Sequence, residues 1–336
     1  MEKKLNWAVM GTGGIAGNVA GNLARHGVHF YGAANRTHEK AVVYAKKYGV
    51  EKVFASYDEL LADPFVDVVY IATTHNTHYE FIKKALLAGK HVLCEKTITL
   101  NHLEYEELLG IASEKGLILA EAMTIYHMPL LRSIRKDIAE GKYGTVREVS
   151  ANFGFFARYR PQSRLFSPVF GGGALLDLGV YPLSFMQSFF PISSSRIETE
   201  VKLSSSGVDI YASCAITNAL GQQGNTKFSF RRILPRNSKI ITSKGEIRIP
   251  TFNRAEKAVY VDEKSRRKTV LREGFTKDAL YYEFVDMERA IKTNDPSLMR
   301  VEDTKAVLRI MDQIRDIWGV KFPSEKRTRI TLLNKR

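Results

Sequence analysis

The sequence contains little cysteine and no long apolar run. Among its 336 residues are two cysteines, Cys94 and Cys214, whose spacing gives neither a disulfide framework nor a metal site. No stretch of eighteen consecutive apolar residues is present, so we expect no membrane span. Residues 1–6 lack the apolar core and the cleavage site of a signal peptide. These absences favour a cytoplasmic protein that carries no metal.

Acidic residues are also fewer than basic residues. The chain has 50 lysines and arginines against 36 aspartates and glutamates, a formal net charge of +14. Such an excess suggests anionic ligands or a nucleic-acid surface. However, the sequence lacks zinc-ligand spacing, a helix-turn-helix signature and the aromatic motifs of RNA-binding domains. We therefore expect a solvated basic surface and no nucleic-acid partner, although local basic clusters occur at 231–232, 266–268 and 326–336.

The length and the order of the apolar segments predict two domains. A chain of 336 residues is too long for a single hydrophobic core. Up to residue 123, apolar strands alternate with helical patterns, as in a doubly wound parallel sheet. From residue 124 onward, segments of alternating polarity predict a mostly antiparallel sheet with one covered face. The expected fold class is therefore α/β, with domains at 1–123 and 124–336.

A glycine-rich turn follows the first predicted strand. Residues 5–10 are apolar, and a helical segment at 15–25 and a strand at 28–34 come after the turn. This is the context of the Rossmann dinucleotide fingerprint, in which glycine permits a tight turn and lets the backbone approach a pyrophosphate. The alternative is an ordinary glycine-rich turn. The predicted cofactor-binding residues are Gly11, Thr12, Gly13, Gly14, Ile15 and Ala16, which fit G-x-G-x-x-G/A.

The end of the second strand indicates which dinucleotide binds. An NAD site normally has Asp or Glu there, to hold the ribose 2′-hydroxyl. Here Asn35, Arg36 and Thr37 follow the strand, with no acid before Glu39. Arg36 can pair with a 2′-phosphate and Thr37 can donate a hydrogen bond, so NADP is preferred and NAD is possible. Alternatively, Arg36 stacks on adenine and does not discriminate between the two.

Further candidates lie where other strands of the predicted parallel sheet end, because the carboxyl edge of such a sheet binds the ligand. Lys96 leaves the strand at 91–95, where burial can tune its pKa and its ammonium can hydrogen-bond a reacting oxygen. The alternative is a surface lysine. His78 can orient a nicotinamide pocket or be a buried structural histidine. The other cofactor-binding candidates at this edge are Thr73, Thr74, His75, Asn76 and Glu95.

Several segments resemble the Gfo/Idh/MocA oxidoreductase family, in order and along nearly the whole chain. The resemblance implies an N-terminal Rossmann domain and a C-terminal α/β domain with a large open-faced sheet, which binds substrate and commonly carries the oligomer contact. It also implies NAD(P)-dependent oxidation of a sugar, a polyol or a related hydroxyl compound. Residues 120–123, 129–132 and 181–182 are most similar to the dimeric dihydrodiol dehydrogenase and glucose–fructose oxidoreductase branch. The segments that carry the family resemblance are 11–16, 88–96, 171–181 and 245–250.

The resemblance places Lys96 and Tyr181 at the catalytic positions, with Asp177 beside them. Alcohol oxidation needs a hydride acceptor and a base for the hydroxyl proton. A free phenol has a pKa of about 10, and a neighbouring ammonium lowers it, so Lys96 can make Tyr181 an effective base. On a continuous helix Asp177 and Tyr181 share a face. The alternatives are helix capping for Asp177 and core packing for Tyr181. Thr97 stands where the family usually has proline after the lysine.

The remaining expectations concern substrate and partners. Arg158, Arg164 and Tyr126 can join the three catalytic residues in binding the substrate, with an exposed basic loop or simple packing as the alternatives. The resemblance and the alternating strands from 197 to 262 predict a homodimer through the open sheet face, since an uncovered apolar face is unfavourable in a monomer. The expected function is an NADP-preferring dehydrogenase. A cofactor-bound regulator without turnover is the alternative, and a nucleic-acid-binding protein ranks last.

Overall fold

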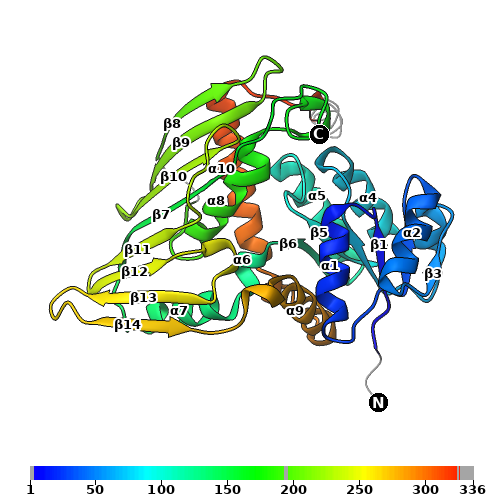
Figure 1. Ribbon diagram of the computed structural model, residues 1–336, viewed down its shortest axis with the longest axis horizontal. Coiled ribbons are helices and arrows are strands. Elements are labelled where there is room, and N and C mark those ends of the chain that lie inside the picture. Colours follow the sequence, from blue (N-terminus) through cyan, green and yellow to red (C-terminus); the bar gives the residue numbers. More distant parts are fainter. Residues whose placement is uncertain (1–3, 193–195, 324, 326–336) are drawn as a thin grey trace. The chain divides into compact units, whose positions relative to one another are not determined.

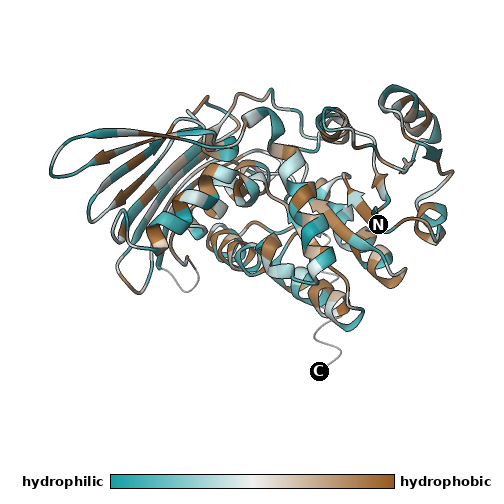
Figure 2. Ribbon diagram, turned by 90° about the horizontal axis from the view of Figure 1, so that it is seen from below, coloured by the Kyte–Doolittle hydropathy of each residue, from teal (hydrophilic) through white to brown (hydrophobic). Residues whose placement is uncertain are grey.

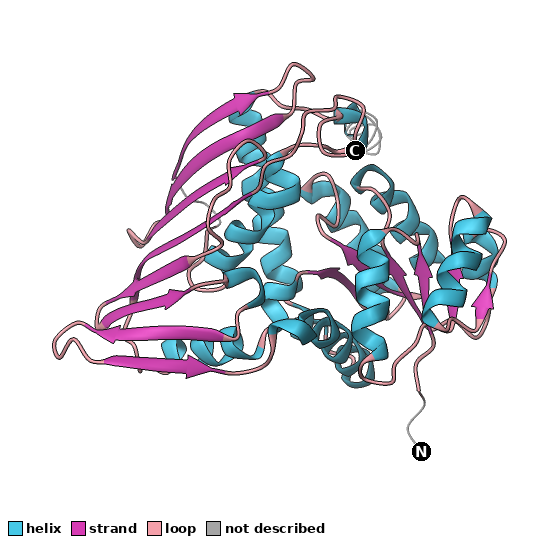
Figure 3. Ribbon diagram, in the orientation of Figure 1, coloured by secondary structure: helices cyan, strands magenta, loops and turns pink. Residues whose placement is uncertain are grey.

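The chain forms two compact units. The computed structural model describes residues 4–192, 196–323 and 325, so the basic cluster at 326–336 lies outside the described residues. Each unit contains its own sheet (Figure 1), and helices accompany both sheets (Figure 3). Unit 1 comprises Met1–Thr99, Leu103–Ala122 and Leu280–Val301, and unit 2 comprises Leu100–His102, Met123–Ala279 and Glu302–Arg336.

The sheet of unit 1 is parallel throughout. Within the described residues it has six strands in the order β3-β2-β1-β4-β5-β6, the order of a Rossmann fold. All residues of β1 and β4 are buried, as expected of parallel strands covered on both faces. The strands are Trp7–Met10 (β1), Gly32–Ala34 (β2), Lys52–Val53 (β3), Val68–Ile71 (β4), His91–Glu95 (β5) and Leu119–Ala122 (β6). The helices between them are Gly14–Ala24 (α1), His38–Tyr48 (α2), Tyr57–Ala62 (α3), His75–Leu87 (α4) and His102–Glu114 (α5).

Helix α9, Ala279–Thr293, belongs almost entirely to unit 1 although it lies far along the sequence. The Phe284 ring packs on Trp7, with 4.4 Å between ring centroids, and on Tyr70, with 5.4 Å. Trp7 also donates its indole N–H to Glu288 at 3.1 Å. The sequence predicts this helix but assigns it to the second domain. An amphipathic pattern indicates that a helix covers a core, but it does not indicate which core.

Two differences from the sequence prediction concern single elements. The helical pattern in the sequence predicts a helix that begins at Tyr79, but α4 begins at His75. Residues that follow β4 therefore form the first turn of α4 and not a free loop. Strand β14, Lys268–Arg272, is absent from the prediction because its side chains are mostly exposed and its polarity does not alternate. The first difference affects the candidate site, since it changes how His75, Asn76 and His78 are held.

The sheet of unit 2 is large and mostly antiparallel, as expected. In the part of the chain that the structure describes it has eight strands in the order β14-β13-β12-β11-β7-β10-β9-β8, and only β7 and β10 run parallel. Helices α8 and α10 lie along one face (Figure 1), where Trp318 packs on Phe228. The strands other than β14 are Val146–Gly154 (β7), Arg196–Leu203 (β8), Asp209–Thr217 (β9), Gln223–Ser229 (β10), Ser238–Thr242 (β11), Gly245–Ile249 (β12) and Lys257–Asp262 (β13). The helices are Thr124–His127 (α6), Pro129–Ala139 (α7), Val180–Gln187 (α8) and Val301–Trp318 (α10).

The other face of this sheet is of mixed polarity, whereas the sequence argument assumes an apolar face. The strands alternate between hydrophilic and hydrophobic residues (Figure 2). One row of cross-strand partners has an acid on β8, basic residues on β11 and β12, and valines on β13 and β14. That row is Glu198, Ala215, Asn225, Ser150, Lys239, Arg248, Val259 and Val270. Glu198 pairs with Arg196 on β8, and Arg248 pairs with Glu246 on β12.

One described segment of unit 2, Pro168–Gln187, is long and apolar enough to cross a membrane by length and composition. Its window is not a continuous apolar run, because glycines and polar residues such as Asp177 interrupt it. In the fold, 83% of that window is buried inside the protein. Packing in the core of unit 2 therefore accounts for its apolar character.

Candidate functional site

The glycine-rich turn after β1 is shaped by close backbone contact. Gly11 has φ +92°, and a Cβ there would lie 2.8 Å from the carbonyl oxygen of Ala72, so only glycine fits between the ends of β1 and β4. Gly13 is the N-cap of α1, and a Cβ added to it meets no described atom within 4 Å. Among the described residues, no side chain caps α1 and no acid lies in its first turn. The N–H groups at residues 14–16 can therefore bind a pyrophosphate.

The residues that follow β2 are tied to this turn. Asn35 donates its side-chain amide to the Thr12 hydroxyl at 2.8 Å, and its oxygen accepts the backbone N–H of Thr37 at 2.9 Å. Arg36 lies between them with an exposed side chain. Asn35 thus organises the turn, while Arg36 is available to a ligand that binds over the glycines.

The segment between β4 and α4 forms a second part of the sheet edge. The Thr77 hydroxyl donates to that of Thr73 at 2.8 Å, and the Thr74 hydroxyl donates to the side-chain oxygen of Asn76, also at 2.8 Å. The ring Nε2 of His75 lies 3.2 Å from the carbonyl oxygen of Lys96. These contacts join the start of α4 to the turn that follows β5.

Lys96 is half-buried and stands in a tightly held turn. The peptide bond between Lys96 and Thr97 is cis. The residue before it, Glu95, is buried and accepts the phenol hydrogen of Tyr70 at 2.5 Å; burial, together with that carboxylate, raises the pKa of Tyr70 well above its ordinary value. After the turn, the Ile98 N–H donates to a carboxylate oxygen of Glu121 at 3.0 Å. Side chains from three other strands and helices therefore fix the backbone around Lys96.

His78 supports the same turn from α4. Its ring Nδ1 lies 2.9 Å from the carbonyl oxygen of Thr97, and its Nε2 lies 3.3 Å from that of Thr73. The side chain has no exposed surface, and burial, with a smaller effect from His75, lowers its pKa to about 3. A neutral imidazole has one N–H, and the shorter distance assigns it to Nδ1, donating to Thr97. Of the two predicted roles, this position fits the buried structural histidine.

In unit 2, the glycines at 171–173 lead into the segment that carries Asp177 and Tyr181. A Cβ at Gly172 would lie 2.8 Å from the carbonyl oxygen of Ser167. Residues Leu175–Gly179 form a turn of π-helix, and α8 begins at Val180. The helix is therefore not α-helical throughout, because a π-helical turn precedes α8. Four residues are close to one full turn in either kind of helix, so Asp177 and Tyr181 still lie on about the same face.

Asp177 has an ion-pair partner in the preceding loop. Arg164 Nη1 lies 3.2 Å from Asp177 Oδ1; the arginine side chain is 57% exposed and the aspartate side chain 10%. The Tyr181 ring is half-buried and packs on Phe153, with 5.4 Å between centroids. Of the other candidates in unit 2, Arg158 is exposed in the loop after β7, and Tyr126 is buried in α6.

Two buried acids that hold the backbone near candidate site residues were not identified from the sequence. Glu121 holds the turn after Lys96, and Asp209 of β9 accepts the Leu175 N–H at 2.6 Å, two residues before Asp177. Both are buried acids: Glu121 lies inside the otherwise apolar strand β6, and Asp209 is the first residue of β9. That pattern is the signal that finds them, because a buried carboxylate needs a partner.

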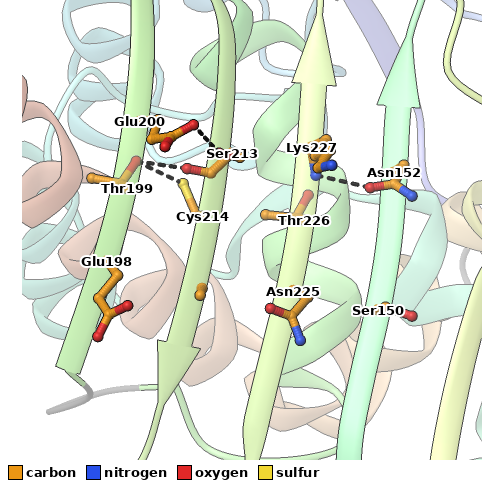
Figure 4. A pocket seen from close by; sticks show the side chains of 11 residues that line it. Ser150, Asn152, Glu198, Thr199, Glu200, Ser213, Cys214, Asn225, Thr226 and Lys227 are labelled. Atoms are coloured by element: carbon orange, nitrogen blue, oxygen red, sulfur yellow. Dashed lines mark hydrogen bonds between the residues drawn. The ribbon is translucent and has the colours of Figure 1, made fainter.

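A separate hollow of about 470 Å³ lies on the open face of the unit 2 sheet (Figure 4). Glu198, Glu200 and Lys227 are among its lining residues, and none of the candidate catalytic or cofactor-binding residues lines it. Within the described ranges, no group of three or more His, Cys, Asp or Glu side chains is arranged to hold a metal ion.

Comparisons with known proteins agree with this arrangement. Residues 5–123 match an oxidoreductase family with an NAD-binding Rossmann fold, and residues 131–248 match a GFO/IDH/MocA C-terminal domain. A trans-1,2-dihydrobenzene-1,2-diol dehydrogenase of Mus musculus is 28% identical over 333 residues, 96% of this chain and 99% of the relative. A D-xylose 1-dehydrogenase (NADP(+)) of Hypocrea jecorina is 36% identical over 204 residues, 54% of this chain and 52% of the relative. The crystal structure of a 3-ketoreductase from Actinomadura kijaniata, in complex with NADP and TDP-benzene, has a TM-score of 0.81 at 24% identity and covers 94% of this chain and 98% of that chain.

The parallel sheet and its glycine-rich turn define a dinucleotide-binding oxidoreductase. The protein belongs to the Gfo/Idh/MocA oxidoreductase family, in agreement with the resemblance of its motifs. It is an NAD(P)-dependent dehydrogenase acting on CH–OH groups, and its relatives include dihydrodiol and sugar dehydrogenases, as the predicted branch implies.

Proposed function

We propose that the protein is an NADP-preferring dehydrogenase that oxidises a sugar, a polyol or a dihydrodiol-type compound, or reduces the corresponding carbonyl. The exposed side chain of Arg36 at the end of β2, where an NAD enzyme has an acid, carries the cofactor preference. The similarity to a dihydrodiol dehydrogenase and to an NADP-dependent xylose dehydrogenase supports the substrate class.

The chemistry assigns one task to each catalytic side chain. A bound nicotinamide cofactor, held over the glycine-rich turn at residues 11–16, would supply the acceptor for the hydride of the carbinol carbon. The hydroxyl proton of the substrate passes to the phenolate oxygen of Tyr181, and a C=O bond forms as the O–H and C–H bonds break. The Lys96 ammonium favours the phenolate and hydrogen-bonds the substrate oxygen. The half-buried position of Lys96 supports this role, because a charge acts more strongly where little water surrounds it.

Asp177 and the arginines of the loop bind the rest of the substrate. A carboxylate accepts hydrogen bonds from neighbouring hydroxyl groups, and the ion pair with Arg164 orients the Asp177 side chain. Arg158 lies in the same loop and is exposed, so it can meet a polar or acidic group of the substrate. Tyr126 is buried and contributes through packing.

A panel of substrates tests the proposed function. Purified protein is mixed with NADP or NAD and with aldoses, inositols and trans-dihydrodiols, and reduction of the cofactor is followed by absorbance. At least one polyhydroxy compound is expected to give turnover, with a larger kcat/KM for NADP than for NAD. Tight NADP binding without turnover on any of these compounds, or on their carbonyl forms with NADPH, would contradict the proposal.

For assembly, we propose a homodimer through the open face of the unit 2 sheet. The face carries charged side chains of both signs, since Glu198 and Glu200 lie on β8 with Arg196, and Lys239 and Arg248 lie on β11 and β12 with Glu246. A second copy of the same face can therefore bind with opposite charges opposed. Light scattering at low salt should give twice the mass of the 38.0 kDa chain. Exchanging both glutamates of β8 for lysine should shift the mass towards the monomer, whereas reversing the exposed Glu263 outside these strands should not. A wild type that remains monomeric at micromolar concentration would exclude this interface.

A further inference from the structure

The buried carboxylate of Asp209 lies against the start of the segment that carries Asp177 and Tyr181. Asp209 is the first residue of β9 and is 1% exposed. Its Oδ2 accepts the backbone N–H of Leu175 at 2.6 Å. Leu175 is the first residue of the π-helical turn, and α8 follows that turn directly. The carboxylate therefore anchors the amino-terminal end of the whole segment.

The glycine before that segment makes room for the carboxylate. A Cβ at Gly173 would lie 2.3 Å from Asp209 Oδ1, which is closer than any side-chain contact allows. Gly173 also has φ +119°, a conformation that favours glycine. The third glycine of the motif is thus explained by its contact with Asp209, in addition to the turn itself.

The connection between β8 and β9 makes two further hydrogen bonds to the loop that precedes this segment and contains Arg164. The Tyr159 hydroxyl lies 2.7 Å from that of Ser205, and the Ser206 hydroxyl donates to the carbonyl oxygen of Phe166. Together with Asp209, these contacts join residues 205–209 to both ends of the loop that contains Arg164. The loop and the π-helical turn are therefore held by one neighbouring strand connection.

We propose that Asp209 is a positioning residue of the reaction: its carboxylate fixes the start of the π-helical turn and thereby the places of Asp177 and Tyr181. The inference rests on the proposed function, in which those two side chains meet the substrate. A hydrogen bond to an ionised acceptor is stronger than one to a neutral acceptor, and a negative charge at the amino-terminal end of a helix is stabilised by the N–H groups there. The ionised form of Asp209 therefore holds the segment best.

The charge of Asp209 is sensitive to pH near neutrality. Burial raises its pKa to about 6, against the opposing effect of the Leu175 N–H. The charge of Arg315 of α10 lowers the pKa of Asp209. Cys214 lies on the same strand, and burial, with a smaller effect from Asp209, raises the pKa of its thiol to about 12. The facing residues 173–176 contain no titratable side chain.

The test compares Asp209→Asn with the wild type and with Asp262→Asn. Asp262 is a matched control because it also binds a backbone N–H, that of Ser265 at 2.7 Å, in the same sheet. Misplacement of a reacting group by about 1 Å costs roughly 10²-fold in rate, so Asp209→Asn should lower kcat by about 10- to 100-fold. The dissociation constant of NADP should stay unchanged, and Asp262→Asn should keep the wild-type kcat.

The pH profile separates positioning from simple support of the fold. The wild-type kcat should fall on acidification with an apparent pKa near the value of about 6. In Asp209→Asn the acid limb near this value should be absent, and kcat should be low on both sides of it. A variant with the wild-type kcat and the wild-type acid limb overturns the inference. If the variant does not fold, the test is amide hydrogen exchange of residues 171–181 in the wild type. Once the exchange rates are corrected for the intrinsic effect of pH, the protection of these amides should be lower at pH 5 than at pH 8. Equal protection overturns the inference.

Tyr181→Phe, measured in parallel, keeps this inference apart from the proposed function. Full turnover by Tyr181→Phe would refute the catalytic assignment, whatever Asp209→Asn does. Strong loss in Tyr181→Phe with full activity in Asp209→Asn refutes the positioning role alone.

Discussion

The turn after Lys96 in unit 1 and the π-helical turn before Tyr181 in unit 2 are held in opposite ways. In unit 1, a neutral His78 lies against the carbonyl oxygen of Thr97. In unit 2, the carboxylate of Asp209 accepts the N–H of Leu175. Burial lowers the pKa of His78 to about 3 and raises that of Asp209 to about 6. The same physical cause therefore leaves one support neutral at every working pH and lets the other titrate close to neutrality.

This difference teaches that burial alone does not decide whether a support is sensitive to pH. A histidine already loses its charge near neutrality, so burial moves its titration out of the physiological range. An aspartate normally titrates in acid, and burial moves its titration towards that range. Unit 1 should therefore present Lys96 in the same way across a wide pH range, whereas unit 2 should hold Tyr181 less firmly in mild acid.

The largest expected effect comes from removing the two catalytic groups themselves. Lys96→Ala and Tyr181→Phe should each reduce kcat by about 10²- to 10⁴-fold, because each removes a part of one proton transfer. The double variant should lose less than the sum of the two losses in activation free energy, since the residues act as a unit. NADP binding, measured by fluorescence titration, should be largely retained. Independent, additive losses would show that the two turns do not serve the same step.

A smaller effect should follow from a residue outside both turns. Arg36→Ala should weaken NADP by roughly 10- to 100-fold, the range of a lost hydrogen bond to a charged group, and should change NAD binding little. The kcat at saturating NADP should remain near the wild-type value, since Arg36 takes no part in proton transfer. Isothermal titration with both cofactors measures this, with the exposed Lys40→Ala as control. Equal losses for NADP and NAD would remove the argument for cofactor preference.

The smallest effects concern stability, and the two supports should give opposite signs. The folded-state pKa of His78 lies below its ordinary value of 6.5, so its stabilisation is present above pH 6.5 and is lost as pH falls towards 3. The folded-state pKa of Asp209 lies above its ordinary value of 3.8, so its contribution to the stability of the whole fold is present below that value and is lost as pH rises through 6. This sign comes from the cost of burying the charge, whereas the hydrogen bond from the Leu175 N–H acts in the opposite direction and is strongest with the ionised carboxylate. Each contributes a slope of at most about 1.4 kcal/mol per pH unit to the free energy of unfolding.

Urea unfolding between pH 4.5 and 7.5 measures both slopes. Subtracting the curve of His78→Asn from that of the wild type should leave a stability difference that grows with pH. The same subtraction for Asp209→Asn should leave a difference that shrinks with pH. If both stability differences changed with pH in the same direction, the proposed contrast between a neutral support at Lys96 and a charged support at Tyr181 would be wrong.

The sequence by itself determined the alternation of strands and helices in unit 1, the glycine-rich turn and the place of Lys96 at the end of a strand. These features are local, because a strand followed at once by glycines and a helix has one common arrangement. The strand predicted at 91–95 has these ends in the structure. Arg36 is likewise visible, since the cofactor-selecting position follows β2 directly.

Only the tertiary structure decided which elements support the candidate site. Asp209 follows Leu175 by 34 residues, and Ile98 meets Glu121 across a separation of 23. The periodicity of a sequence shows that a residue faces a core, but it cannot show which distant backbone group its side chain meets. The assignment of α9 to unit 1, the π-helical turn and the mixed polarity of the open sheet face were decided in the same way, by packing between segments that are far apart in the chain.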